Sequence, residues 1–144
     1  MKRRIPGLHG NGRGSEEIFD GIFLVRVDRA FYRWHPQRPF YVLRFAIIEP
    51  REHQSRSLNG RLYCSSKALW KLRWFLRDFG YDPDLMNKDE VDEKTLLGLR
   101  GIVRISHTTL NGRCFLNLGG FAPASEWDEL SVSVTHHQEV PSDV

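Results

Sequence analysis

Hydrophobic and polar positions alternate with a period of two near the start of the chain. In residues 21–32, GIFLVRVDRAFY, Val25 and Val27 alternate with Arg26 and Asp28. This alternation is the pattern of a half-buried strand. The following HPQRP cannot continue a central strand, because proline lacks the backbone donor of the ladder. We therefore expect a first strand over residues 21–32 and a loop after it.

Two further stretches also predict strands. Residues 56–64 alternate Leu58 and Leu62 with polar side chains, and Gly60 is expected to mark a bulge. Residues 40–49, FYVLRFAIIE, predict the second strand. Its core face carries Tyr41, Leu43, Phe45 and Ile47, and its other face carries Phe40, Val42, Arg44 and Ala46.

After the third expected strand the apolar period becomes that of an amphipathic helix. Ser66 is the expected N-cap, and Gly80 is expected to follow the C-cap. Residues 81–98 are acidic and interrupted by Pro83, so we expect only a short helical turn there. The apolar stripe of the main helix consists of Leu69, Leu72, Leu76 and Phe79, broadened by Ala68 and Phe75.

Residues 100–121 contain Asn111-Gly112 between two strand-like runs, which is the signature of a two-residue hairpin turn. Such a turn places Leu110 opposite Arg113 and Thr108 opposite Phe115. Because side chains alternate along a strand, Phe115 then points away from the core. The core face carries Val103, Ile105, Leu116 and Leu118, and the other face carries Arg104, Thr108, Phe115 and Asn117.

The expected order is three strands, one helix and two strands. This is the order of the oligonucleotide-binding (OB) fold, a mainly β, five-stranded Greek-key barrel, here with one helix between strands three and four. An open sheet with one helix packed across it is the alternative. We divide the chain into a flexible basic arm (residues 1–17), an OB-fold domain (18–125) and an acidic tail (126–144).

Length and composition fit a single cytoplasmic domain. The chain has 144 residues, which suits one domain. No apolar run approaches the roughly 20 residues that span a bilayer, and the basic N-terminus has no apolar signal segment behind it. Cys64 and Cys114 have no CxxC partner, which favours reduced thiols over a disulfide framework or a zinc site.

Charge is unevenly distributed along the chain. Residues 20–77 contain twelve Lys or Arg and four Asp or Glu, whereas residues 78–97 contain seven acids and two lysines. Of the 21 basic residues, 16 are arginine, whose planar fork suits phosphate and stacks on bases. A surface that is basic in one region can attract a polyanion although the net charge is only +3. An ordinary solvated surface with uneven charge is the alternative.

Several segments resemble a family of small OB-fold proteins of phages and mobile elements, encoded near recombination and replication genes. The resemblance covers residues 21–121. It implies the OB fold and a role as a single-stranded-DNA-binding or recombination-accessory protein. The matching segments are GIFLVRV, LRFAIIE, LNGRLY, a helix containing ALWKL, LLGLRGIVRI and CFLNLGGF.

A protein binds a single strand with rings that stack on bases and cations that meet phosphates. Both residue types occur on the outer faces of the expected strands and in the first loop. We therefore expect single-stranded DNA or RNA as the partner. The candidate nucleic-acid-binding residues are Arg26, Tyr32, Arg33, Trp34, Arg38, Phe40, Arg44, Arg61, Tyr63, Arg104 and Phe115. Of these, Arg44, Arg61, Arg104 and Phe115 are expected to share one outer wall of the closed barrel.

Other interpretations of these residues stay open. Tyr32 and Trp34 could pack under their own loop, and Phe40 could belong to the end of the core. The acidic tail could compete for the basic groove or recruit a partner, or its SVSVT could be disordered or form an edge strand. The expected helix carries a second candidate surface, for a protein partner or a dimer, in Trp70, Arg73, Trp74 and Arg77, where one tryptophan could instead seal the barrel.

No set of residues predicts an enzyme. The histidines show no metal-ligand spacing, and the cluster Asp89, Glu90, Asp92 and Glu93 is typical of a solvated helix face. LNGR and GNGRG are too short for phosphate loops, and a Walker lysine is absent. We expect no catalytic residues, no metal and no cofactor.

Overall fold

The structure is a computed structural model, and it describes residues 19–132. Its main element is one five-stranded sheet in the order β3-β2-β1-β4-β5, with every neighbouring pair antiparallel. The mainly β class predicted from the sequence is therefore confirmed. The strands are β1 (Gly21–Arg33), β2 (Phe40–Glu49), β3 (Ser57–Tyr63), β4 (Arg100–Leu110) and β5 (Arg113–Pro123).

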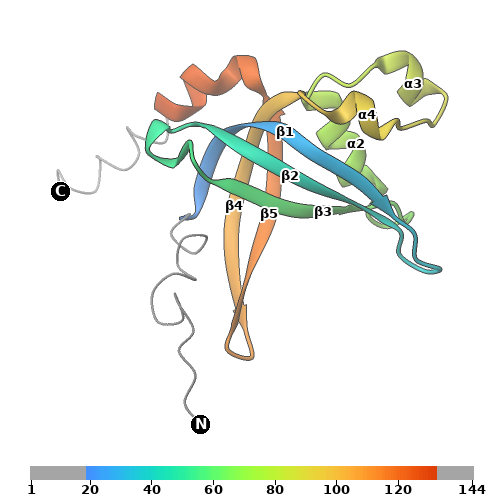
Figure 1. Cartoon of the computed structure of the whole chain (residues 1–144), viewed down its shortest axis with the longest axis horizontal. Coiled ribbons are helices and arrows are strands. Elements are labelled where there is room, and N and C mark those ends of the chain that lie inside the picture. Colours follow the sequence, from blue (N-terminus) through green and yellow to red (C-terminus); the bar gives the residue numbers. More distant parts are fainter. Residues whose placement is uncertain (1–18, 133–144) are drawn as a thin grey trace, which may run out of the picture.

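Three helices, not one, lie between β3 and β4 in the chain, and Figure 1 shows them gathered at one end of the sheet. They are α2 (Leu69–Asp78), α3 (Pro83–Asn87) and α4 (Glu93–Leu96). The short 3-10 turn η1 (Arg51–His53) joins β2 to β3, and η2 (Ala124–Glu126) follows β5. No helix among residues 19–132 is long and apolar enough to cross a membrane.

The core lies between the inner face of the sheet and α2. The predicted inner face of β2 is confirmed, since Tyr41, Leu43, Phe45 and Ile47 are all buried. From α2 the core receives Leu72, Phe75 and Leu76, whereas Leu69, expected in the same stripe, is 40% exposed. Phe75 and Phe79 pack against Phe45 and Phe121, so aromatic rings join the helix to the sheet.

The expected closure of the sheet into a barrel is not found. Within the described residues, β3 and β5 are the edge strands, and no backbone ladder joins them. They meet instead through a side chain, because a Cβ on Gly60 would lie 2.4 Å from Cδ1 of Leu118. The Leu118 side chain occupies the space between the two edges and keeps their backbones apart.

Gly60 is therefore a point of close approach and not the predicted bulge. The β2–β3 register runs through it without a shift, with Gly60 opposite Leu43. The register shifts lie elsewhere, and their unpaired residues are Asp28 in β1, Ile48 in β2 and Gly119 in β5.

The hairpin register predicted from Asn111-Gly112 is confirmed. Leu110 lies opposite Arg113 and Thr108 opposite Phe115. Both turn residues have positive φ, 53° for Asn111 and 78° for Gly112, as a two-residue turn of this kind requires. Beyond Ile105 the β4–β5 pair leaves the rest of the sheet, and Figure 1 shows it as a projecting arm.

The ends of α2 were predicted only in part. Ser66 does not cap the helix, which begins at Leu69 after the N-cap Ala68 and has no side-chain cap. At the other end the prediction is confirmed: Gly80 has φ 79°, and the amides of Gly80 and Tyr81 donate to the carbonyls of Arg77 and Leu76. This is the Schellman pattern of helix termination.

Two expectations about the chain after α2 are corrected. Pro83 does not break a helix but begins α3, where proline fits because the first helical N–H has no partner. The Asp82 side chain caps α3 by accepting from the Asp84 amide at 2.9 Å. Part of the expected tail is helical over residues 127–132, so its Ser131 and Val132 form no edge strand. Residues 1–18 and 133–144 of the expected arm and tail lie outside the described residues.

Candidate functional site

Arginines and aromatic rings lie in contact with one another on the outer face of β2 and β3. The guanidinium carbon of Arg38 lies 4.3 Å from the centre of the Tyr63 ring. The Tyr63 and Phe40 rings are 5.4 Å apart, and the guanidinium carbon of Arg61 lies 4.7 Å from the centre of Phe40. The result is a continuous column of cation, ring, ring and cation. Cation–π contacts of this kind attract each guanidinium to the face of its ring.

The neighbouring strand β1 extends this surface. Arg33 lies opposite Phe40 and Phe31 opposite Val42 in the register, so both point to the same outer face. The guanidinium carbon of Arg33 lies 4.7 Å from the centre of the Phe31 ring. Arg29 lies opposite Arg44 in the next row. We define the outer patch as Arg29, Phe31, Arg33, Arg38, Phe40, Arg44, Arg61 and Tyr63.

Arg44 carries an internal ion pair. Its Nε lies 2.8 Å from Oδ1 of Asp28, and the two side chains are 38% and 26% exposed. Asp28 occupies the bulge of β1 between Val27 and Arg29. The carboxylate fixes the direction of the Arg44 side chain and cancels part of its charge. Any anionic ligand that binds the Arg44 guanidinium therefore has to compete with the Asp28 carboxylate.

The loop between β1 and β2 carries an exposed tryptophan. Trp34 is 73% exposed and does not pack under its own loop. The loop itself is organised by His35, whose Nδ1 accepts from the amides of Gln37 at 3.1 Å and Arg38 at 3.0 Å. These bonds require Nδ1 to be unprotonated. They place Trp34 and Arg38 on either side of one compact turn.

Tyr32 does not belong to the outer patch. Its ring packs edge-on against Tyr41, 5.2 Å between centres, and its amide donates to Glu93 at 3.2 Å. Regular alternation from Arg26 would have put Tyr32 on the outer face. The bulge between Val27 and Arg29 shifts the phase, so Phe31 and Arg33 point outward in its place. Sequence reasoning missed Phe31 and Arg29 for the same reason.

The structure does not bring the four expected wall residues together. Arg44 and Arg61 are near neighbours, because their register partners Asn59 and Val42 belong to adjacent rows. Arg104 is paired with Ile22, near the other end of β1. Arg29, the partner of Arg44, lies seven positions after Ile22, which corresponds to about 23 Å of strand. The expectation of one shared wall is therefore wrong.

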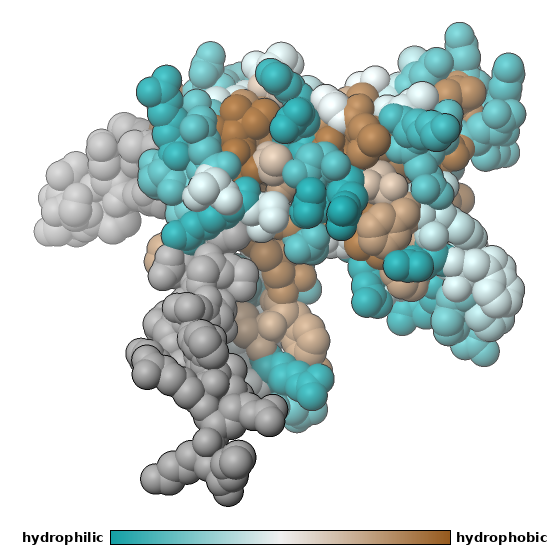
Figure 2. Space-filling view, viewed as in Figure 1, coloured by the Kyte–Doolittle hydropathy of each residue, from teal (hydrophilic) through white to brown (hydrophobic). Residues whose placement is uncertain are grey.

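Phe115 also lies apart from the outer patch, whereas the exposed Arg26 adjoins it. Phe115 is 47% exposed on the β4–β5 hairpin, beside Leu110, which is 60% exposed. Figure 2 shows apolar atoms along this projecting hairpin and hydrophilic atoms toward its tip. Arg26 pairs with Ala46 on one side and Arg100 on the other, in the outer-face row next to that of Arg29 and Arg44. Arg100 lies eight positions before Thr108, the partner of Phe115, so Arg26 and Phe115 do not share one region.

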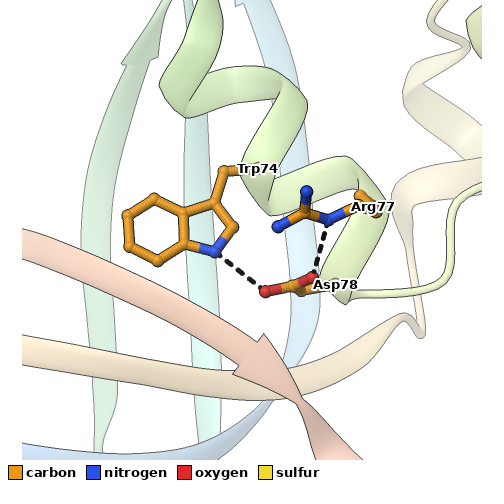
Figure 3. A network of polar contacts seen from close by, with 3 residues as sticks. All are labelled: Trp74, Arg77 and Asp78. Carbon is orange, nitrogen blue, oxygen red and sulfur yellow. Dashed lines mark hydrogen bonds and ion pairs between the residues drawn. The ribbon is translucent and has the colours of Figure 1, made fainter.

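The tryptophans of α2 have different environments. Trp74 packs edge-on against Phe121, its ring lies above Gly120, and its Nε1 donates to Asp78 at 2.9 Å (Figure 3). The Nε of Arg77 forms an ion pair with the same carboxylate, 3.1 Å from Oδ1 of Asp78. Trp70 stacks on Trp74, with centres 6.1 Å apart, and is 60% exposed. Trp74 therefore contributes mainly to the packing of α2 on the sheet, whereas the Trp70 ring is exposed to solvent.

Burial changes the titration of two side chains near the start of β2. Burial, with smaller contributions from Cys64, Glu93 and neighbouring tyrosines, raises the pKa of Tyr41 to about 12. Burial also raises the pKa of the Cys64 thiol. Both groups are therefore uncharged at neutral pH. Over residues 19–132 no three His, Cys, Asp or Glu side chains are grouped as ligands for a metal ion.

Comparison with known proteins gives no family for this chain. No family model matches it, and a search of curated proteins finds no significantly similar sequence. The resemblance to phage and mobile-element OB-fold proteins stays a prediction.

Proposed function

We propose that this protein binds single-stranded nucleic acid through the outer patch, with DNA as the first polymer to test. In this proposal it shows little sequence preference and acts as a non-enzymatic accessory in replication or recombination. The single observation that carries the proposal is the column of Arg38, Tyr63, Phe40 and Arg61. It combines, on one face, the two residue types that a single strand requires.

We further propose that the sheet is an opened OB barrel. Two features support this assignment: the strand order β3-β2-β1-β4-β5, and the contact of Leu118 with Gly60. Joining the two edges would give a five-stranded Greek-key ring, and OB barrels are often only partly closed. The face of strands two and three is the one on which OB folds bind oligonucleotides. The outer patch lies on β2 and β3 and continues onto β1.

The chemistry of binding follows from the way the arginines are held. A guanidinium stacked on a ring has lost part of its conformational freedom, so less entropy is lost when it contacts a phosphate. Its free planar face can also stack on a base. The exposed Trp34 ring supplies a further stacking surface, and each stacked base contributes roughly 1–3 kcal/mol. None of these contacts reads base edges, which explains the low sequence preference.

Fluorescence anisotropy with a labelled oligo-dT at low and high salt tests the proposal. We expect binding at low salt and a steep loss of affinity as salt rises, because phosphate neutralisation releases counterions. Trp34→Ala should weaken binding about tenfold without unfolding the chain. Trp70→Ala removes another exposed ring, on α2; it is the matched control and should leave affinity unchanged. Undetectable binding at low salt would remove the proposal.

A second candidate function is docking of a protein partner on α2. The specific observation is the exposed Trp70 ring, stacked on the fixed Trp74 beside the half-exposed Leu69. Tryptophans in such settings often dominate binding energy at protein interfaces. Sedimentation of the wild type and Trp70→Ala tests one form of this idea. A larger species that only the wild type forms would favour self-association through α2.

A further inference from the structure

A cavity of about 370 Å³ lies between α2, the beginning of β2 and the segment around α3, at the end of the sheet where Figure 1 shows the helices. Its size is within the range of ligand pockets, and at the density of liquid water it holds about twelve non-hydrogen atoms. The apolar part of its wall includes four buried or half-buried side chains: Leu72, Leu76, Met86 and Val91. The interior therefore favours a small ligand with an aliphatic part.

One buried polar group in the cavity wall has no partner. Tyr41 lines the cavity and is 9% exposed, and its hydroxyl makes no hydrogen bond to any residue between 19 and 132. By contrast, the hydroxyl of the buried Tyr81 has two hydrogen-bond partners. Buried hydroxyl groups are normally hydrogen-bonded. The Tyr41 hydroxyl is therefore available to a polar group of a ligand.

Charges of opposite sign lie where the cavity opens to solvent. Arg73 belongs to α2, Asp89 and Glu90 follow α3, and all three are exposed lining residues. Within the part of the chain that the structure describes, none of the three makes an ion pair, either with one another or with a different residue. A ligand with one charge would be attracted by one side of the opening and repelled by the other. A ligand that carries both charges close together can pair with both sides.

The two sides of the opening are held by the fold. On the acidic side, the Tyr81 hydroxyl donates to the Glu90 carbonyl at 3.3 Å and accepts from the Asp92 amide at 2.8 Å. Tyr81 itself is 3% exposed, so these bonds anchor the backbone of the acidic segment to the core. On the other side, Arg73 projects from a helix that packs on the sheet. A site whose backbone is already fixed loses less entropy when a ligand binds.

We propose that the cavity binds a free α-amino acid with an aliphatic side chain, such as leucine, isoleucine or methionine. The side chain enters the apolar interior, the carboxylate pairs with Arg73, and the ammonium group pairs with Asp89 and Glu90. A guanidinium suits the carboxylate, because two parallel hydrogen bonds can form. The Tyr41 hydroxyl can bond to either charged group of the ligand. Because Tyr41 faces the core side of β2, this site is separate from the outer patch and does not depend on nucleic-acid binding.

NMR titration of the full chain with leucine tests the proposal, with the methyl signals of Leu72, Leu76 and Met86 as the readout. We expect saturable shifts of these signals. Three analogues each remove one feature of the ligand: glycine lacks the side chain, leucinamide lacks the carboxylate, and N-acetylleucine lacks the ammonium group. Each should bind about tenfold more weakly or worse, as expected when a buried side chain or a hydrogen bond to a charged group is lost.

Variants of the exposed lining residues assign each charge of the ligand to one side of the opening. Arg73→Gln should weaken leucine binding about tenfold but should not weaken leucinamide binding, because leucinamide has no carboxylate to lose. The double variant Asp89→Asn, Glu90→Gln should weaken the binding of leucine but not that of N-acetylleucine. Asparagine tolerates the left-handed conformation at position 89, where φ is 58°. The circular dichroism spectra should be unchanged, because all three side chains are exposed.

Three results would overturn the proposal. The first is that leucine, isoleucine and methionine all fail to produce saturable shifts in the wild type. The second is that leucine binds no better than glycine, leucinamide or N-acetylleucine. The third is that Arg73→Gln weakens leucine and leucinamide equally, since the guanidinium would then not hold the carboxylate.

Discussion

Arg38 lies over the ring of Tyr63, with 4.3 Å between the guanidinium carbon and the ring centre. The two residues come from different parts of the chain, a loop before β2 and the end of β3. Their contact joins the loop that carries Trp34 to the face that carries Phe40 and Arg61. The proposed nucleic-acid surface depends on this junction, and the first prediction addresses it.

Tyr63→Leu should weaken oligo-dT binding about five- to twentyfold, because both Arg38 and Phe40 lose the ring that positions them. Fluorescence anisotropy at low salt measures the change. Tyr63→Phe retains the ring and should bind as the wild type does. Equal affinities for the leucine and phenylalanine variants would show that the ring has no role in binding.

His35 organises the β1–β2 loop through its unprotonated Nδ1, so His35→Ala should loosen the loop. Each lost hydrogen bond is worth about 1 kcal/mol, which corresponds to roughly fivefold faster amide exchange at Gln37 and Arg38. Hydrogen exchange followed by NMR measures these two amides. His35→Asn supplies a side-chain oxygen that can accept from amides two and three residues ahead, and it should restore most of the protection. Identical exchange in the wild type and His35→Ala would contradict the assigned role.

Gly101→Ala should destabilise the fold by about 1–3 kcal/mol, because an added Cβ would meet the buried Phe79 ring at 2.4 Å. Urea unfolding followed by tryptophan fluorescence measures the free energy of unfolding. Gly119→Ala is the matched control on the neighbouring strand. There the nearest atom would be 3.7 Å from the Cβ, an ordinary contact, and we expect a change within about 0.5 kcal/mol. Equal effects at the two sites would argue against the packing of Phe79 on β4.

Stability should fall between about pH 10 and pH 12 because of Tyr41. Its pKa is raised from 10.0 to about 12 in the folded state, mainly by burial. In that range the unfolded chain loses the phenolic proton while the folded chain keeps it, so rising pH favours unfolding. A shift of two units corresponds to about 2–3 kcal/mol, which is fully lost above pH 12.

Tyr41→Phe removes this titration. Urea unfolding at pH 8 and at pH 11.5 should therefore show a smaller loss of stability in the variant than in the wild type. The comparison between the two proteins cancels the titration of other tyrosines and lysines. The same loss in both would mean that Tyr41 ionises equally in the folded and unfolded chains.

Local patterns in the sequence determined the strands and the hairpin. The bounds of β2 and the register around Asn111-Gly112 agree with prediction, because alternation and a two-residue turn are properties of neighbouring residues. Within the candidate site, the outward positions of Phe40, Arg44, Arg61 and Tyr63 followed from the same alternation. Their mutual contacts did not, since cation–π stacking joins residues from different strands and from the loop.

Only the tertiary structure decided where the phase of a strand changes and where the edges of the sheet meet. The bulge in β1 exchanges Tyr32 for Phe31 on the outer face, and a bulge depends on pairing with a second strand. Leu118 separates β3 from β5 at Gly60, a contact between residues 58 positions apart. Sequence periodicity describes the neighbours of a residue along the chain. The outer patch and the open edge depend on which distant segments pack together, and that is decided by the whole core.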